Sequence, residues 1–422
     1  MNKISLFQHQ KTVLEQTKDF NKVAYYLDMG LGKTFVGAEK AIQMNKNILL
    51  VCQKSKIEDW KEHFIEYYAV GNVIYDLTNK KELNQFINID IKPWLKIGII
   101  NYDLVFRRPD LLNLKDFTLM LDESSLIQNE DAKRSKFILK MNPANVILLS
   151  GTPTSGKYEN LWTQAHLLGW KISENVYQKQ YVNWKKIDVG GVLINTVDKD
   201  NPYKNVDRLK NKLKENGAVF MKTEECFDLP KQNFIDIKVN SSKEYRKFKK
   251  DRIIVIDDNE LVGDTKFSQI LCERQLCGMY SKEKLQAFKD IAESTKDRLI
   301  VFYNFNKEVE QLKVIAEELE RPISIVNGKI KDLKAYEEND DSITFIQYQA
   351  GAMGLNLQKA NKIIYFTLPL MSELFEQSKK RIHRIGQTKP CYYYTLTIKN
   401  SIEKDIKNIL EMRKDYTDEL FR

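Results

Sequence analysis

The stretch Leu27-Asp28-Met29-Gly30-Leu31-Gly32-Lys33-Thr34 decides the fold of this chain. An apolar run, Val23–Leu27, leads into this glycine-containing turn, and a helix-like stretch, Phe35–Met44, follows it. A strand, a glycine turn and a helix N-terminus together form an anion site, because backbone N–H groups and the positive end of the helix dipole point at a phosphate. We expect Lys33 to reach the β- and γ-phosphates of a nucleotide and the Thr34 hydroxyl to hold Mg²⁺.

This turn departs from the strict phosphate-loop pattern at one position. The strict pattern places a glycine five residues before Gly32, where this chain has Leu27. Taken alone, Gly-Leu-Gly-Lys-Thr also fits an ordinary turn that caps a helix. The remainder of the chain must therefore decide between a nucleotide site and a helix cap.

Length, composition and charge limit the kinds of protein that this chain can be. Its 422 residues suffice for two or three domains, and 42% hydrophobic with 30% charged residues is typical of a folded globular protein. The formal net charge of +9 permits a polyanionic partner, but it fits a lysine-rich solvated surface equally well. No apolar run approaches the roughly 20 residues of a membrane span, so we expect no membrane partner.

The cysteines and histidines argue against a zinc site and for a reducing compartment. The chain has five cysteines and four scattered histidines, with no Cys-x-x-Cys pair. An odd number of cysteines fits reduced thiols, and the polar N-terminus lacks the apolar centre of a signal peptide. We therefore expect a cytoplasmic protein.

Short apolar runs alternate with helical patterns in two parts of the chain, which predicts two α/β lobes with parallel sheets. The predicted strands of the first lobe are Val23–Leu27, Asn47–Cys52, Lys96–Ile100, Phe117–Leu121 and Asn145–Leu149. Those of the second lobe are Arg298–Phe302, Pro322–Val326, Ile343–Gln347, Lys362–Phe366 and Tyr392–Thr397. The predicted helices are Ser55–Tyr68, Asp131–Lys140, Lys282–Ser294, Lys307–Glu320, Met371–Arg384 and Ser401–Lys414. We place the lobes at residues 1–225 and 226–422. About 157–225 is expected to be an inserted, mainly helical protrusion with a hairpin around Gly190-Gly191.

Two polar strings follow apolar strands of the first lobe directly. Asp122-Glu123 follows one, and the carboxyl ends of parallel strands are where ligands bind. There Asp122 would hold Mg²⁺, and Glu123 would orient or deprotonate the water that attacks a γ-phosphate. Ser150-Gly151-Thr152-Pro153 ends another strand at the same edge, where its hydroxyls would sense that phosphate. Each string also fits a plain strand end, since acidic pairs, glycine and proline are common there.

Two further strings lie in the second half. Gln377–Gln387 contains Arg381 and Arg384, which are three residues apart and would share one face of a helix. An arginine pair can stabilise charge on a transferring phosphoryl group, although basic residues also favour helix C-termini. Gln349–Leu357 is rich in small residues that allow close approach of a nucleotide or a nucleic-acid backbone, or simply a tight loop.

These strings, taken in order, resemble the motifs of the superfamily 2 helicase-like ATPases and, among them, the Swi/Snf-like double-stranded DNA translocases. The matching strings, from the Q motif through motifs I, Ia, Ib, II, III, IV, V and VI, are Leu6–Gln10, Asp28–Thr34, Leu49–Cys52 with Trp60, Ile100–Asp103, Asp122–Ser125, Ser150–Pro153, Leu299–Phe302 with Asn304, Gly351–Leu357 and Gln377–Gln387. The segment Phe220–Thr223, followed by Leu229-Pro230, is similar to the inter-lobe segment of that family. The ending His-Arg-Ile-Gly-Gln is especially typical of the Swi/Snf-like branch.

The resemblance implies two RecA-like lobes with ATP and Mg²⁺ in the cleft between them. In such a protein the catalytic groups would be Lys33, Asp122, Glu123, Arg381 and Arg384, with Thr34 and Asp122 at the metal. The nucleotide would contact Gln10, Met29, Gly30, Leu31, Gly32, Lys33, Thr34 and Gly354. The implied function is ATP-driven translocation on duplex DNA by a compact monomer of bacterial or phage type.

Three positions in two motifs depart from the family pattern. Ser124-Ser125 stand where the family usually has Ala-His, so coupling of hydrolysis to DNA contact through that histidine is in question. Ala352 stands where glycine is usual.

Two other functions stay open. One is a strand-separating DNA or RNA helicase, for which the Gly190-Gly191 hairpin would be the pin. The other is a RecA-like clamp without catalysis, against which the intact Lys33, Glu123, Arg381 and Arg384 argue.

Overall fold

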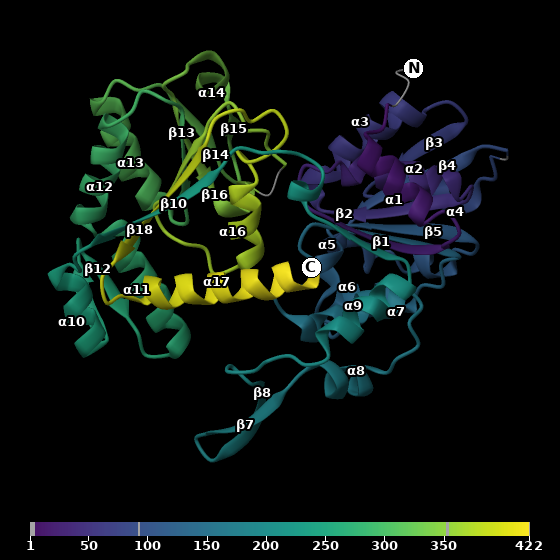
Figure 1. The fold of residues 1–422 in the computed structure, drawn as a ribbon, viewed down its shortest axis with the longest axis horizontal. Coiled ribbons are helices and arrows are strands. Elements are labelled where there is room, and N and C mark those ends of the chain that lie inside the picture. Colours follow the sequence, from purple (N-terminus) through teal and green to yellow (C-terminus); the bar gives the residue numbers. More distant parts are fainter. Residues whose placement is uncertain (1–4, 92, 352–353, 422) are drawn as a thin grey trace. The chain divides into compact units, whose positions relative to one another are not determined.

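The computed structural model describes residues 5–91, 93–351 and 354–421 and divides into two compact units (Figure 1). The first unit comprises Met1–Cys226 with Asp415–Arg422, and the second comprises Phe227–Lys414. We refer to them as the first and the second lobe. Each is built on one large, mostly parallel sheet, which confirms the predicted fold class. Among the described residues, no helix combines the length and the apolar character needed to cross a bilayer.

The first lobe contains a seven-stranded sheet in which all neighbouring strands run parallel. Its order is β3-β4-β2-β5-β6-β1-β9. The strands are β1 (Lys22–Leu27), β2 (Asn47–Cys52), β3 (Asn72–Asp76), β4 (Leu95–Asn101), β5 (Phe117–Asp122), β6 (Asn145–Ser150) and β9 (Ala218–Met221). The helices of this lobe are α1 (Gln8–Gln16), α2 (Lys33–Gln43), α3 (Ile57–Tyr68), α4 (Lys80–Asn88), α5 (Tyr102–Val105), α6 (Lys133–Lys140), α7 (Trp162–Leu167), α8 (Glu174–Tyr181) and α9 (Val206–Glu215).

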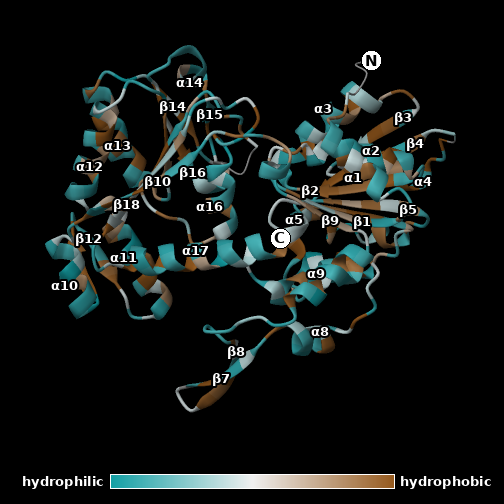
Figure 2. Cartoon of the chain, in the orientation of Figure 1, coloured by the Kyte–Doolittle hydropathy of each residue, from teal (hydrophilic) through white to brown (hydrophobic). Residues whose placement is uncertain are grey.

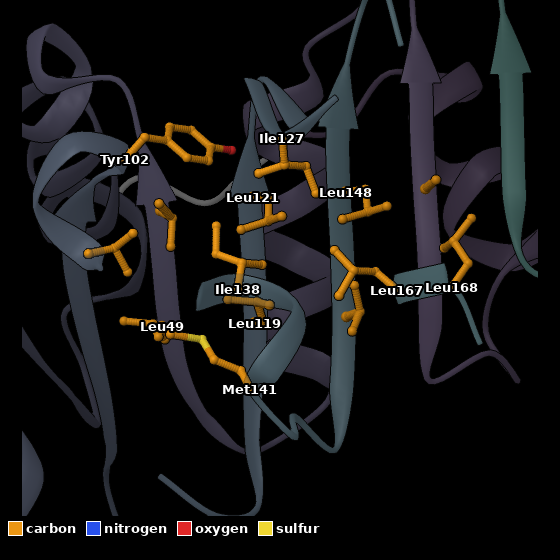
Figure 3. Close-up of a cluster of buried hydrophobic side chains, with 14 of the residues drawn as sticks. Leu49, Tyr102, Leu119, Leu121, Ile127, Ile138, Met141, Leu148, Leu167 and Leu168 are labelled. Atoms are coloured by element: carbon orange, nitrogen blue, oxygen red, sulfur yellow. The ribbon is translucent and has the colours of Figure 1, made fainter. Parts of the chain in front are cut away.

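Helices cover both faces of this sheet, because its central strands are apolar at almost every position. On one face, Leu121 and Leu148 pack with Ile138 of α6 and with Leu168 in one buried hydrophobic cluster (Figure 3). On the other face, Gly37 of α2 lies so close to the neighbouring Leu149 that a Cβ there would come within 2.8 Å of it. Alternate residues of one strand therefore serve two separate layers of helices.

The second lobe contains a sheet of order β10-β18-β17-β13-β16-β14-β15, parallel except for the short β15. Its strands are β10 (Gln232–Val239), β13 (Leu299–Tyr303), β14 (Ile323–Val326), β15 (Lys331–Asp332), β16 (Ile343–Gln347), β17 (Lys362–Tyr365) and β18 (Cys391–Ile398), with a separate hairpin of β11 (Ile253–Ile256) and β12 (Asn259–Val262). Its helices are α10 (Lys243–Asp251), α11 (Lys266–Met279), α12 (Lys282–Glu293), α13 (Asn306–Glu318), α14 (Lys334–Glu338), α15 (Tyr348–Gly351), α16 (Ser372–Lys379) and most of α17 (Ile402–Phe421).

One predicted helix is wrong in its extent. The sequence predicted a helix over Met371–Arg384, whereas α16 ends at Lys379 and the chain then turns. The Arg381 carbonyl accepts a hydrogen bond from the Leu357 backbone N–H (3.1 Å), so the backbone here binds a neighbouring loop and does not continue the helix. Arg381 and Arg384 therefore do not share a helical face.

The protrusion predicted over 157–225 is smaller than expected. Its hairpin of β7 (Trp184–Val189) and β8 (Val192–Val197) forms at Gly190-Gly191 as predicted, and it extends from the lobe (Figure 1). Ala218–Met221, in contrast, is the edge strand β9 of the main sheet, paired parallel to β1. The segment therefore returns to the sheet before the lobe ends.

The last residues of α17 pack on the first lobe, although sequence analysis placed them with residues 226–422. The Tyr416 ring lies edge-on to Tyr203, with 5.0 Å between ring centroids, and its carbonyl accepts from the Tyr158 hydroxyl (2.6 Å). Leu420 is fully buried in the first-lobe core. Long-range packing of this kind leaves no local pattern in the sequence.

We predict that Leu420→Ala destabilises the first lobe by about 2–5 kcal/mol, because it leaves a cavity in a packed core. The matched control is Met412→Ala on the same helix, where the side chain is 40% exposed. All five tryptophans lie within residues 60–184, so urea unfolding followed by tryptophan fluorescence reports the first lobe. Equal unfolding midpoints for the two variants would show that the C-terminal segment does not belong to the first-lobe core.

Candidate nucleotide site at the edge of the first sheet

The phosphate-loop geometry predicted after β1 is formed. Gly30 (φ 91°) and Gly32 (φ 74°) both adopt the left-handed conformation that favours glycine, and α2 begins at the next residue, Lys33. The first backbone N–H groups of an α-helix find no acceptor within the helix itself, so the N-terminus of α2 suits an anion. Strand, turn and helix thus occur in the order that a phosphate site requires.

Helix α1 supports this loop from outside. The Gln10 side chain donates from Nε2 to the Leu31 carbonyl (3.2 Å) and accepts at Oε1 from the Phe7 backbone N–H (2.9 Å). A Cβ on Gly32 would clash with Gln10 Nε2, so the contact requires glycine at that position. Gln10 therefore lies against the loop, and its contact with a nucleotide stays a prediction.

The Lys33 ammonium lies over the loop and next to another strand end. Its Nζ donates to the Leu27 carbonyl (2.8 Å) and more weakly to that of Asp28 (3.4 Å). A Cβ on Gly151 would lie 3.3 Å from the same Nζ. The ends of β1 and β6 therefore meet around this one positive charge, as the sequence predicted for the strings at this edge.

The carboxylate of Asp122 is held by a tryptophan from α3. Trp60 Nε1 donates to Asp122 Oδ2 (2.8 Å), and the Tyr102 hydroxyl donates to the Asp122 carbonyl (2.9 Å). Burial raises the pKa of Asp122, while the Trp60 hydrogen bond and the positive charges of Lys33 and Lys56 oppose that rise. Asp122 is thus electrostatically linked to Lys33 across the strand ends.

Glu123 and Thr152 show the two local irregularities expected of a ligand site. Glu123 has φ 53°, a left-handed conformation that costs a non-glycine residue roughly 1–2 kcal/mol. The Thr152 hydroxyl is buried and has no hydrogen-bond partner among the described residues. A buried hydroxyl of this kind is usually satisfied, so it fits an oxygen of a bound ligand.

The group fits a nucleotide with its metal. Loop N–H groups and the Lys33 ammonium suit phosphate oxygens, and the oxygens of Thr34 and Asp122 suit Mg²⁺, which commonly takes few protein ligands beside the phosphates. Asp28, which directly follows β1, accepts at Oδ2 from the Thr223 hydroxyl (2.9 Å). This hydrogen bond connects the glycine loop to the segment after β9.

The second-lobe candidates form their own group. Arg384 Nη1 lies 3.5 Å from the Leu355 carbonyl, and burial lowers the pKa of this arginine. Gly354 has φ 71°, and Arg381 is buried in the turn after α16. Ala352 and Met353 of the small-residue string lie outside the described residues.

Sequence reasoning missed the amide of Gln164 behind the first-lobe site. Its Nε2 donates to the Pro153 carbonyl (2.7 Å), and its Oε1 accepts from Ser124 and Tyr26. A signal was present, because Gln164 stands on the same helical face as Leu161, Ala165 and Leu168. An amide in an otherwise apolar stripe must find buried partners.

Comparison with known proteins identifies two domains in the chain. The model of the SNF2-related domain matches residues 23–289, and that of the helicase conserved C-terminal domain matches residues 283–386. An uncharacterized ATP-dependent helicase of Mycoplasma genitalium is 23% identical over 92% of this chain and 39% of its own length. The mouse SWI/SNF-related matrix-associated actin-dependent regulator of chromatin subfamily A member 1 is 22% identical over 92% of this chain and 40% of its own length.

A solved structure, the SWI2/SNF2 ATPase core of Sulfolobus solfataricus in complex with double-stranded DNA, covers 99% of this chain and 93% of its own, with 18% identity and a TM-score of 0.47. The chain spans about two fifths of the length of the first curated relatives that it matches. The SNF2-related model covers well over half of the chain. The chain therefore belongs to the SNF2-related family.

Proposed function

We propose that this protein is an ATP-driven motor that moves along duplex DNA. The observation that carries the proposal is the meeting of three strand ends around Lys33, which brings the phosphate loop, Asp122-Glu123 and Thr152 to one edge. Membership of the SNF2-related family supports the same reading. The five cysteines are all free, which supports action in the reducing cytoplasm, and we propose that the motor acts as a monomer.

In this proposal the first lobe binds and activates the nucleotide. Gly30 and Gly32 would present backbone N–H groups to the phosphates, and Gln10 would contact the base from beside them. The N–H groups of Met29 and Leu31 donate to Asp28, so contact of these two with a phosphate would replace those bonds. Lys33, which donates to the Leu27 carbonyl, would bind a phosphate oxygen instead, and Thr34 with Asp122 would hold Mg²⁺. Glu123 orients the attacking water and accepts its proton. The bound metal would supply neutralisation of charge on the β- and γ-phosphates.

The second lobe contributes positive charge to the same nucleotide. Arg381 and Arg384 are proposed to stabilise the transferring phosphoryl group, with Gly354 allowing close approach of the loop. A nucleotide shifts the arrangement of two lobes only through contacts that differ between the two states. The excess of positive charge, +9, suits binding through DNA phosphates, which would weaken steeply with salt.

A strand-separating helicase is the second candidate, and one observation favours it. The β7–β8 hairpin projects from the first lobe with exposed apolar residues, Val192 and Leu193, next to its turn (Figure 2). A pin of this shape is what duplex separation needs. Two observations distinguish the candidates: which nucleic acid stimulates ATP hydrolysis, and whether the duplex is separated.

We expect duplex DNA to stimulate ATP hydrolysis more than single-stranded DNA or RNA does. The motor should also displace the third strand of a triplex without separating the duplex. Lys33→Ala is the control, because loss of that charge should reduce hydrolysis about 10²-fold or more. Stronger stimulation by single strands, together with unwound duplex, would favour the helicase. Normal hydrolysis by Lys33→Ala would remove the nucleotide site from this edge.

We predict that Arg384→Ala lowers hydrolysis by about 10³-fold or more while nucleotide affinity stays nearly unchanged, because the arginine acts on charge in the transition state. Arg246→Ala, an exposed arginine of α10, is the matched control for loss of one positive charge from the second lobe. Single-turnover hydrolysis and binding of a fluorescent ATP analogue measure the two quantities. An unchanged rate for Arg384→Ala would exclude it from catalysis.

A further inference from the structure

One buried amide joins the three segments that carry the first-lobe candidates. Gln164 is completely buried at the centre of α7, in a helix whose neighbouring Leu167 and Leu168 pack on the sheet (Figure 3). Burying an amide without partners costs several kcal/mol in an apolar environment, about 1–3 by protein mutational data. The position is therefore determined by hydrogen bonds more than by packing.

The two polar side-chain atoms of Gln164 bind three segments between them. Oε1 accepts from Ser124 Oγ (2.7 Å), in the turn after Asp122-Glu123, and from the Tyr26 hydroxyl (3.1 Å), in β1. Nε2 donates to the Pro153 carbonyl (2.7 Å), in the loop after β6. Ser124 and Tyr26 are themselves completely buried, so water does not compete for these bonds.

The two ends of this link are next to the irregular residues of the site. Ser124 directly follows Glu123, which is held in the left-handed conformation, and Pro153 directly follows Thr152 with its buried hydroxyl. A ligand that draws Thr152 toward itself moves the Pro153 carbonyl. Through Gln164, that movement is transmitted to the Ser124 hydroxyl and hence to the backbone that aims Glu123.

We propose that Gln164 is a positioning residue that couples the Thr152 loop to the Asp122-Glu123 turn, with Ser124 as its donor. The inference rests on the proposed ATP hydrolysis at this edge. It also gives Ser124, one of the two departures from the family pattern in this turn, a specific task. A serine can donate to the amide, whereas the alanine usual at that position cannot.

A second, weaker route runs beside this one and provides a control. Gln128 Nε2 lies 3.4 Å from the same Pro153 carbonyl and 3.3 Å from Ser155 Oγ, but Gln128 is only partly buried. Gln128→Met removes an amide of equal size that reaches the same loop and lacks the bond to Ser124.

The experiment compares Ser124→Ala, Gln164→Met, the double variant and Gln128→Met with the unaltered protein. We expect Ser124→Ala and Gln164→Met each to lower kcat about 10- to 100-fold, with the KM for ATP changed less than about twofold, because misplacement of Glu123 affects the chemical step. The double variant should be no slower than Gln164→Met alone, since both changes break one link. Gln128→Met should keep kcat within about threefold.

Hydrogen exchange without nucleotide provides a readout that does not depend on catalysis. Ser124→Ala should speed amide exchange in residues 151–156, the segment that Gln164 holds through the Pro153 carbonyl. In a protein that already carries Gln164→Met, the added Ser124→Ala should not change the exchange of these residues further. The coupling would be overturned if the loss of kcat in the double variant equalled the product of the two single losses. It would also be overturned if Ser124→Ala left amide exchange in residues 151–156 unchanged. Absence of hydrolysis by the unaltered protein would instead contradict the proposed function, so the two failures are distinguishable.

Discussion

Parallel pairing sends the carboxyl ends of β1, β5 and β6 to one edge of the first sheet, and the candidate site depends on that constraint. These three strands are neighbours in the sheet, although Leu27 at the end of β1 and Asn145 at the start of β6 are 118 positions apart in the chain. Each continues into a short polar segment. Because the strands are buried on both faces, their register cannot slip without exposing apolar side chains to water. The packed core therefore determines where the polar segments that follow these strands lie.

The charges at this edge are arranged around Lys33. Its ammonium contacts the carbonyls of its own loop, lies near Gly151 and acts on the carboxyl group of Asp122. A positive charge in this position lowers the free-energy cost of burying the ionised carboxylate, and it attracts an anion. Trp60 completes the arrangement from α3, because its indole N–H donates to Oδ2 of Asp122.

Local patterns predicted much of this, and tertiary contacts decided the remainder. Continuous apolar runs identified the central strands, and the glycine spacing identified the turn between β1 and α2. The edge strands β3, β9 and β10 were missed. The apolar stretches of β3 and β9 are short, and β10 has only partly buried and exposed positions. The end of α16 depends on the bond between Leu357 and Arg381, which no local pattern encodes.

The candidate site likewise combines residues predictable from local patterns with contacts that only the packed fold creates. Asp122 ends β5 and Glu123 directly follows it, while Lys33 begins α2 after the loop that follows β1. Their meeting was therefore predictable from chain order and sheet topology. The Gln164 link joins residues 40 and 138 positions away, and only the packed fold brings them together. Ser124, which stands where the family usually has alanine, thus finds its hydrogen-bond partner in another helix, at Gln164 of α7.

The most direct measurement is a crystal structure of the full chain with Mg²⁺ and a non-hydrolysable ATP analogue. The account predicts the phosphates on the backbone N–H groups of Gly30–Thr34, Lys33 Nζ moved from the Leu27 carbonyl to a phosphate oxygen, and the metal beside Asp122. A nucleotide bound elsewhere, or Lys33 still bound to Leu27 with the analogue present, would contradict it.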